Sequence, residues 1–284
     1  MGDRIVVFAN KWWEAVPLVG VFTNQQACPT DLSEVSRPVA SGASAITPRL
    51  FFRCREFDLE TWCVQDLMNP DENPSLTWEK ARVLPRAIDA GKKPRLVVSL
   101  GSAACPNGDD QNGNVVVGSS VFIHDPIPAS VKHWKPPSPD KIVPSDAAKS
   151  LDAIPRKFVG EATKRLLSPP NKPAQSPEIM IGNNLVSVGD VNVTDPALYA
   201  KADKETLEAF AAAAGSMRPG SMETTHGMIR MVADAPFLYV SGFANAVGKY
   251  AQEVMANEYA QNFVAAHNAA IVLAWLLPEV VQQL

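Results

Sequence analysis

Short apolar runs that end in small or polar residues constrain the fold of this chain more than any other feature. Such runs occupy residues 5–9, 94–101 and 237–241, and they are typical of strands that are buried on both faces of a sheet. Residues 114–121 and 184–188 are further strand candidates, whereas 75–84 and 204–214 have helical spacing. Strands therefore alternate with helices along the chain, which predicts an α/β fold.

The chain has 284 residues, which is within the range of one large α/β domain, so we expect a single domain covering residues 1–284. Residues 125–177 are rich in Pro, Ser and Lys and contain a helical interlude at 146–167. We expect this segment to form an excursion on the surface. A further helix is predicted at 258–277, and Pro278 is expected to end or kink it. One face of this helix would carry Phe263, Ala266, Ala270, Leu273 and Leu277.

Composition and charge favour a small-molecule ligand. The apolar fraction of 46%, the charged fraction of 20% and the net charge of −4 offer no general attraction to nucleic acid or to an anionic membrane. Because there is no run of about eighteen apolar residues and no signal-peptide pattern, we expect a soluble, cytoplasmic protein without a membrane partner. The cysteines lack the spacing of a zinc site or a disulfide framework, so no metal or organic cofactor is expected. They are Cys28, Cys54, Cys63 and Cys105.

Polar side chains follow three of the predicted strands. The first strand leads into Asn10-Lys11-Trp12-Trp13-Glu14, the second into Gly101-Ser102-Ala103-Ala104, and the last into Asn245. Loops at the ends of strands in an α/β sheet converge on the crevice where ligands bind. The small residues around Ser102 would also let the backbone approach a ligand closely.

Together with Val115 to Asp125, Ser187-Val188-Gly189-Asp190 and Met222-Glu223-Thr224, these segments occur in a characteristic order and spacing. In this order the chain resembles the nucleoside phosphorylase and nucleosidase superfamily, especially the methylthioadenosine and adenosylhomocysteine nucleosidases. The resemblance implies a three-layer α/β fold whose central mixed sheet is partly closed like a barrel and flanked by helices. It also implies a homo-oligomer, with a dimer favoured.

The resemblance assigns roles to individual residues. Cleavage of a nucleoside passes through a cationic, oxocarbenium-like sugar, so it needs a base for water on one face and a donor for the departing base on the other. Glu14 would activate the water and Ser102 would help to place it. Met222 and Glu223, expected at a helix start, would hold the ribose, the carboxylate accepting hydrogen bonds from its hydroxyls. Without the resemblance, this pair would be a core methionine and a helix-terminal acid.

Two departures from the family pattern concern the base. Asn245 stands where adenine-releasing relatives carry an aspartic acid; an amide cannot deliver a proton, but it can donate one hydrogen bond and accept another, which suits a 6-oxopurine-like base. Asn192 and Val193 follow Asp190 where an aromatic ring is expected to stack on the purine. This departure indicates either a different or more polar base or a ring from elsewhere, such as Phe243 or a tryptophan.

The expected anion site of a phosphorylase is missing. Phosphorylases surround phosphate with arginines, whereas Lys11 is the only cation on the loop after the first strand. The sequence therefore favours a nucleosidase that hydrolyses a purine or purine-like ribonucleoside, with Glu14 and Asn245 as its catalytic residues. A phosphate-dependent phosphorylase and a nucleoside-binding protein without catalysis are the alternatives. His226 is interpreted as a partly buried helix histidine with a backbone or Glu223 partner, outside the catalytic set.

Overall fold

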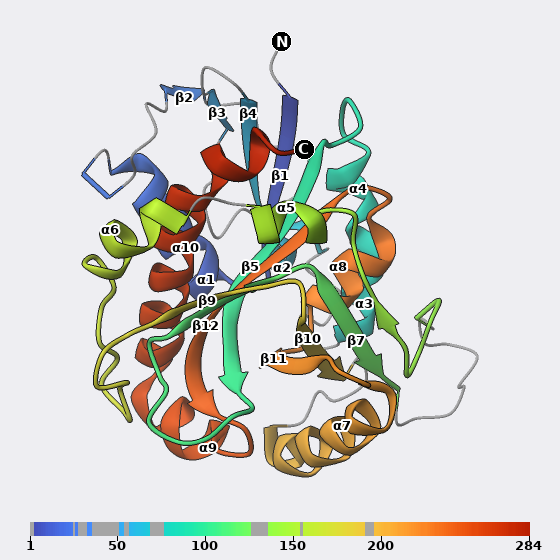
Figure 1. Ribbon diagram of the computed structural model, residues 1–284, viewed down its shortest axis with the longest axis vertical. Helices are drawn as coiled ribbons and strands as arrows, with labels where there is room; N and C mark the ends of the chain where they lie inside the picture. Colours follow the sequence, from blue (N-terminus) through green and yellow to red (C-terminus); the bar gives the residue numbers. More distant parts are fainter. Residues whose placement is uncertain are drawn as a thin grey trace.

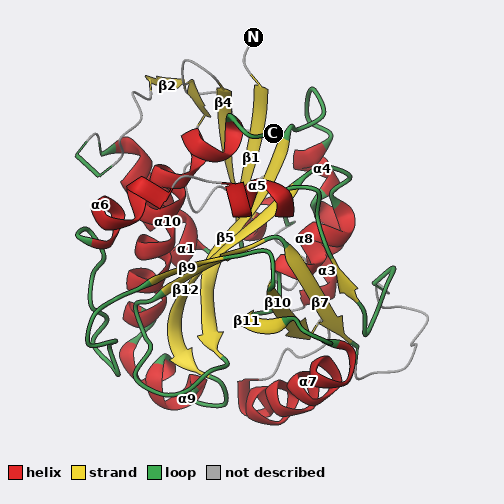
Figure 2. Cartoon of the chain, viewed as in Figure 1, coloured by secondary structure: helices red, strands yellow, loops and turns green. Residues whose placement is uncertain are grey.

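The computed structural model describes residues 3–24, 26–27, 33–35, 51–53, 57–68, 77–125, 136–153, 156–190 and 196–284. These residues form one mixed sheet of twelve strands that is covered by helices. Helices α1, α6 and α10 lie on one side of the sheet and α3, α4 and α8 on the other (Figures 1 and 2). The three-layer α/β architecture that the sequence predicts is therefore confirmed.

The strands are β1 (Asp3–Ala9), β2 (Ser33–Val35), β3 (Phe51–Arg53), β4 (Phe57–Cys63), β5 (Leu96–Cys105), β6 (Val115–Gly118), β7 (Ser120–His124), β8 (Ile142–Val143), β9 (Ile179–Ile181), β10 (Leu185–Asp190), β11 (Arg218–Met222) and β12 (Phe237–Ala246). Their main path runs β2-β3-β4-β1-β5-β11-β10-β7-β8, and β12 branches from β5 to pair with β6, which pairs with β9.

The helices are α1 (Trp12–Thr23), α2 (Val64–Leu67), α3 (Thr77–Val83), α4 (Pro85–Ile88), α5 (Ala148–Ala153), α6 (Val159–Thr163), α7 (Tyr199–Ala213), α8 (His226–Val232), α9 (Tyr250–Glu253) and α10 (Ala260–Val281). Short 3-10 turns are η1 (Arg156–Phe158), η2 (Pro196–Leu198) and η3 (Met255–Asn257).

Parallel pairing of three strands positions the site. Strand β5 pairs in parallel with β1 on one edge and with β12 on the other, so all three strands end at the same edge of the sheet. Leu100 lies opposite Ala9 of β1 and opposite Val240 of β12. The polar segments that follow these strands are therefore brought together, as the carboxyl ends of parallel strands require.

One predicted strand is two strands in the structure. Residues 114–121 divide at Ser119, because β6 pairs antiparallel with β12 whereas β7 pairs in parallel with β10. Gly118 allows close packing at this point, since a Cβ there would lie 2.5 Å from the hydroxyl of Tyr239. The chain changes its pairing partner here, which an apolar run alone does not reveal.

The C-terminal helix differs from the prediction at its end. Pro278 lies inside α10, which continues to Val281, and Leu277, Val280 and Val281 are buried in the core around it. This packing holds the last turn in place although proline removes a backbone donor. Helix α10 is long and apolar enough to cross a membrane. Its most apolar stretch is 72% buried inside the protein, as in the core helix of a globular fold.

The described residues of the segment 125–177 are partly buried rather than wholly on the surface. Leu151, Phe158 and Ala162 belong to the same core cluster as the apolar face of α10. The helical interlude expected at 146–167 is divided into α5, η1 and α6. In α10, the ring of Phe263 is exposed, whereas the other predicted face residues are buried.

Candidate active site

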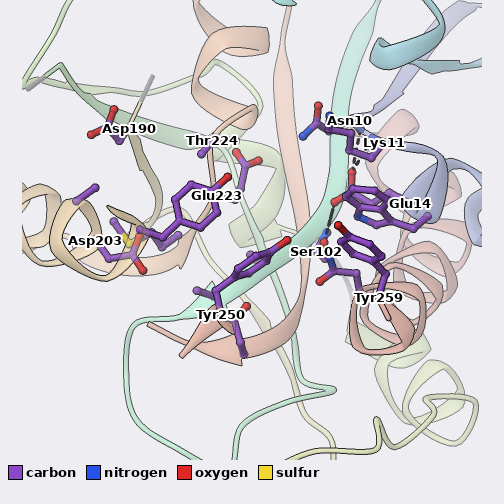
Figure 3. A pocket seen from close by; sticks show the side chains of 18 of the residues that line it. Asn10, Lys11, Glu14, Ser102, Asp190, Asp203, Glu223, Thr224, Tyr250 and Tyr259 are labelled. Atoms are coloured by element: carbon purple, nitrogen blue, oxygen red, sulfur yellow. Dashed lines mark hydrogen bonds between the residues drawn. The ribbon is translucent and has the colours of Figure 1, made fainter. Parts of the chain in front are cut away.

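A cavity of about 280 Å³ lies at the edge where β1, β5 and β12 end (Figure 3). This volume is close to the roughly 300 Å³ at which small-molecule sites begin. The structure brings together five of the residues that the sequence predicted, since the cavity is lined by Glu14, Ser102, Met222, Glu223 and Asn245. Asn192 and Val193 lie outside the described residues.

Four hydrogen bonds hold the Glu14 carboxylate in the cavity. Glu14 lies in the first turn of α1, only 4% exposed, and its Oε2 accepts hydrogen bonds from the backbone N–H groups of Asn10 at 3.0 Å and Lys11 at 3.1 Å. Its Oε1 accepts from both the backbone N–H and the hydroxyl of Ser102, each at 2.8 Å. Burial raises the pKa of Glu14, and the Ser102 and Lys11 hydrogen bonds oppose that rise.

Gly101 explains why the carboxylate can lie against β5. A Cβ at this position would lie 2.8 Å from Oε1 of Glu14. The sequence indicated that small residues here would let the backbone approach a ligand closely. In the structure, the group that lies against the backbone of Gly101 is the carboxylate of Glu14. A larger residue at this position would therefore displace the Glu14 carboxylate.

Met222 and Glu223 lie at a strand end and not, as predicted, at a helix start. Met222 is the last residue of β11, and α8 begins only at His226. The Glu223 carboxylate turns toward that helix, where it accepts hydrogen bonds from the backbone N–H of Thr225 at 2.8 and 2.7 Å and from that of His226. Burial raises the pKa of Glu223 to about 7, while these hydrogen bonds and the charge of Lys80 oppose the rise.

Lys80 is a functional candidate that the sequence did not reveal. It comes from α3, is only 2% exposed, and lines the same cavity as Glu14 and Glu223. Burial lowers the pKa of Lys80 to about 7, the charge of Lys11 acting in the same direction and those of the two glutamates in the opposite one. Its position follows from packing of α3, where the following Ala81 and Val83 are buried. No spacing signal distinguishes it from a solvent-facing helix lysine.

The far side of the cavity carries a second group of polar residues. Asn245, at the end of β12, is buried and its Nδ2 donates to the carbonyl of Ala246 at 2.8 Å. Asp190 ends β10, and Asp203 comes from α7. Figure 3 shows both aspartates across the cavity from Glu14. Burial raises the pKa of Asp203 to about 6, and the charge of Asp190 adds to the rise.

Phe243 does not lie in the cavity, and its assignment to substrate binding is wrong. It is 1% exposed within the core. A bulge between Phe243 and Asn245 shifts the register of β12 against β5. Residues two apart on a regular strand share a face, and the extra residue of a bulge breaks that relation. The sequence could not reveal this shift.

Other rings line the cavity instead. Trp13 stacks on Tyr259 with centroids 4.4 Å apart, and Tyr199 meets Tyr250 edge to face at 5.2 Å. The sequence predicted a stacking ring from Phe243 or from a tryptophan. A tryptophan, Trp13, does line the cavity, together with three tyrosines. Tyrosine is not a residue that the sequence interpretation considered.

His226 is a histidine of helix α8, as predicted, but it is fully buried rather than partly buried. Its Nδ1 lies 2.5 Å from the hydroxyl of Ser99 and its Nε2 lies 2.8 Å from that of Ser241. The partners of the ring are therefore serines, and Oε1 of Glu223 lies further from Nδ1, at 3.5 Å. Burial lowers the pKa of His226 to about 3, so the ring is neutral. Among the described residues, no group of three or more His, Cys, Asp or Glu side chains is arranged to hold a metal ion.

Comparison with known structures shows that the chain has the fold of solved nucleosidases. The chain is similar over its whole length to a mutant of the Helicobacter pylori methylthioadenosine nucleosidase with 5′-methylthioadenosine in its active site, at 15% identity, full coverage of both chains and a TM-score of 0.58.

 It is also similar to the nucleosidase of Neisseria meningitidis in complex with methylthio-immucillin-A, at 14% identity, 99% and 100% coverage and a TM-score of 0.57. A third similar structure is the futalosine hydrolase of Helicobacter pylori, at 14% identity, 99% and 98% coverage and a TM-score of 0.54. No family model and no curated protein matches the chain in sequence.

Proposed function

We propose that this protein is a nucleosidase that hydrolyses the N-glycosidic bond of a purine or purine-like ribonucleoside. The observation that carries the proposal is the Glu14 carboxylate, which backbone and side-chain donors fix in a cavity that also contains Glu223 and Asn245. The fold supports the same conclusion, because structures that share it are named as nucleosidases and as a futalosine hydrolase.

In the proposed reaction, Glu14 accepts a proton from water as the water attacks C1′ of the ribose. Its raised pKa makes it a stronger base than an exposed glutamate, which suits proton transfer near neutral pH. Glu223 accepts hydrogen bonds from the ribose hydroxyls, with Met222 against the sugar, and Asn245 binds the departing base.

The geometry around Glu14 supports hydrolysis over phosphorolysis. The backbone N–H groups of Asn10, Lys11 and Ser102, together with the Ser102 hydroxyl, form a cluster of donors of the kind that binds anions. In this protein the carboxylate of Glu14 already occupies those donors. No arginine lines the described part of the cavity, so a bidentate phosphate contact has no donor there.

We also propose that the protein is cytoplasmic and acts as a homo-oligomer, with a dimer favoured. An exposed apolar patch supports the oligomer. Trp12 packs edge to face on Trp13, which stacks on Tyr259, and Phe263 lies one turn further along α10. Trp12, Tyr259 and Phe263 are 37–38% exposed, and contiguous apolar surface of this kind marks interaction sites.

A nucleoside panel tests the proposed function. Purified protein is incubated with purine and purine-like nucleosides, with and without phosphate, and the products are identified. We expect free base and free ribose at a rate that does not depend on phosphate. Strict phosphate dependence with formation of ribose 1-phosphate would establish phosphorolysis instead, and release of no base in either condition would refute both reactions.

The variant Glu14→Gln tests the mechanism. It should lower the rate by about 10²–10⁴-fold, the usual contribution of a general base. Nucleoside binding, measured as ligand-dependent thermal stabilisation, should remain. Glu161→Gln is the matched control, because Glu161 is an exposed glutamate of α6. If wild-type protein binds nucleosides without turnover, the binding-protein alternative that Asn245 raises is the correct one.

A further inference from the structure

Departure of a purine requires a proton, and Asn245 cannot supply it. Two carboxyl groups line the same cavity from other elements, Asp190 from β10 and Asp203 from α7 (Figure 3). We propose that Asp203 is the general acid that protonates the departing base. This inference rests on the proposed nucleosidase function and assigns the role that the amide of Asn245 leaves open.

The backbone holds Asp203 at the base end of the cavity. Its Oδ2 accepts a hydrogen bond from the N–H of Gly248 at 3.1 Å, and Gly248 follows Asn245 in the turn after β12. The contact joins α7 to the end of the strand that presents Asn245. Within the described part of the chain, no lysine or arginine forms an ion pair with Asp203. Its second oxygen therefore has no cation to keep it ionised.

The surroundings of Asp203 favour the protonated form. Burial raises the pKa of Asp203 to about 6; the negative charge of Asp190 acts in the same direction, and the Gly248 hydrogen bond opposes the rise. The other titratable groups that line the cavity are Lys11, Glu14, Lys80, Tyr199, Glu223, Tyr250 and Tyr259. Neither lysine is among the causes of the shift in the pKa of Asp203. Two neighbouring carboxyl groups do not both ionise readily, so one holds a proton while the other stays charged.

The proposed step balances protons and electrons. The C1′–N bond breaks and its electron pair remains with the base, while the acidic proton of Asp203 moves to a ring nitrogen of that base. Water forms the new C1′–O bond and gives one proton to Glu14. The products are a neutral base and free ribose; Asp203 then regains a proton from solvent and Glu14 releases one, so no other reactant is needed.

Two substrates with different leaving groups test this assignment. A purine nucleoside needs protonation of its base, whereas p-nitrophenyl β-ribofuranoside releases a phenolate that leaves without a proton. Asp203→Asn keeps an oxygen that can accept the Gly248 hydrogen bond. We expect it to lose about 10²–10³-fold on the purine nucleoside, within the usual range for a general acid. On the p-nitrophenyl riboside it should stay within a few fold of wild type, which also shows that the site is folded.

The pH profile and a matched control complete the test. The wild-type rate on the nucleoside should fall as pH rises through about 6, because Asp203 must be protonated, and Asp203→Asn should lack that fall. Glu208→Gln is the control: Glu208 is an acid of the same helix whose side chain is 67% exposed. It should leave both rates and the pH profile unchanged.

Several outcomes would overturn the assignment. Equal loss on both substrates would show that Asp203 has a structural role, and no loss on either would show that it has none in the reaction. Leaving-group-dependent loss in Asp190→Asn, with Asp203→Asn active, would place the acid at Asp190. In each of these cases wild-type base release would still stand. Failure of wild type to cleave either substrate would instead refute the proposed nucleosidase and this inference with it.

Discussion

Removing the hydroxyl of Ser102 should shift the acidic limb of the pH–rate profile upward. That hydroxyl donates to Oε1 of Glu14 at 2.8 Å and opposes the burial that raises the Glu14 pKa. A hydrogen bond to a charged group contributes about 1.5–3 kcal/mol, and roughly 1.4 kcal/mol corresponds to one pKa unit. Three other hydrogen bonds to the carboxylate remain, and water can enter the open cavity, so the lower end of this range applies.

We therefore expect Ser102→Ala to move the acidic limb of kcat/KM upward by about one pH unit. The activity at the plateau should fall less than the activity below it, because Glu14 still ionises at higher pH. The assay is the steady-state cleavage of p-nitrophenyl β-ribofuranoside from pH 4 to 9, because its phenolate leaves without the proton of Asp203 and the rate above the Glu14 limb stays level.

Ser187→Ala is the matched control. Ser187 is a buried serine of β10 whose hydroxyl has no hydrogen-bond partner in the described structure, so its removal should leave the limb in place. If the acidic limb of the Ser102→Ala profile stays in place while the plateau rate falls, the predicted rise in the Glu14 pKa is refuted. That result would mean that the hydroxyl acts on the water or the sugar and does not stabilise the Glu14 carboxylate.

Three further substitutions test the site. Gly101→Ala places a Cβ 2.8 Å from Oε1 of Glu14 and should lower kcat/KM by about 100-fold through displacement of the carboxylate, with little change in Tm. Lys80→Met removes the charge that lowers the pKa of Glu223, so KM for ribonucleosides should rise about fivefold, or roughly 1 kcal/mol, in steady-state kinetics. His226 has a pKa of about 3 when folded, below its ordinary 6.5, so its contribution to stability is lost as pH falls from 6.5 toward 3. In thermal melts, the Tm of His226→Gln should therefore fall less between pH 7 and pH 4 than the Tm of wild type.

The sequence predicted the parts of the site that follow strand ends. Glu14, Ser102 and Asn245 converge because β1, β5 and β12 are parallel neighbours, and parallel strands bring their carboxyl ends to one edge. Apolar runs show where such strands end, so the residues after them can be identified without coordinates. The position of Met222 and Glu223 was predicted from the motif, although their local structure was not.

The groups that come from helices could not be predicted in the same way. Lys80 and Asp203 reach the cavity because of how α3 and α7 are rotated against the sheet, and that rotation depends on tertiary packing. Phe243 was assigned wrongly for a related reason. The bulge before Asn245 separates two residues that a regular strand would place on one face, and no signal in an apolar run marks such a bulge.

The charges of the cavity connect the proposed reaction with its selectivity. The acidic groups that line its described part are Glu14, Asp190, Asp203 and Glu223, and its cations are Lys11 and Lys80. Burial lowers the pKa of both lysines, to about 7 for Lys80, and it raises the pKa of Glu14, Asp203 and Glu223. The carboxylates that stay ionised, the Glu14 base among them, stabilise the positive charge that develops on the sugar. The ionised Glu14 carboxylate also repels phosphate, so the group that favours cleavage favours water as the nucleophile as well.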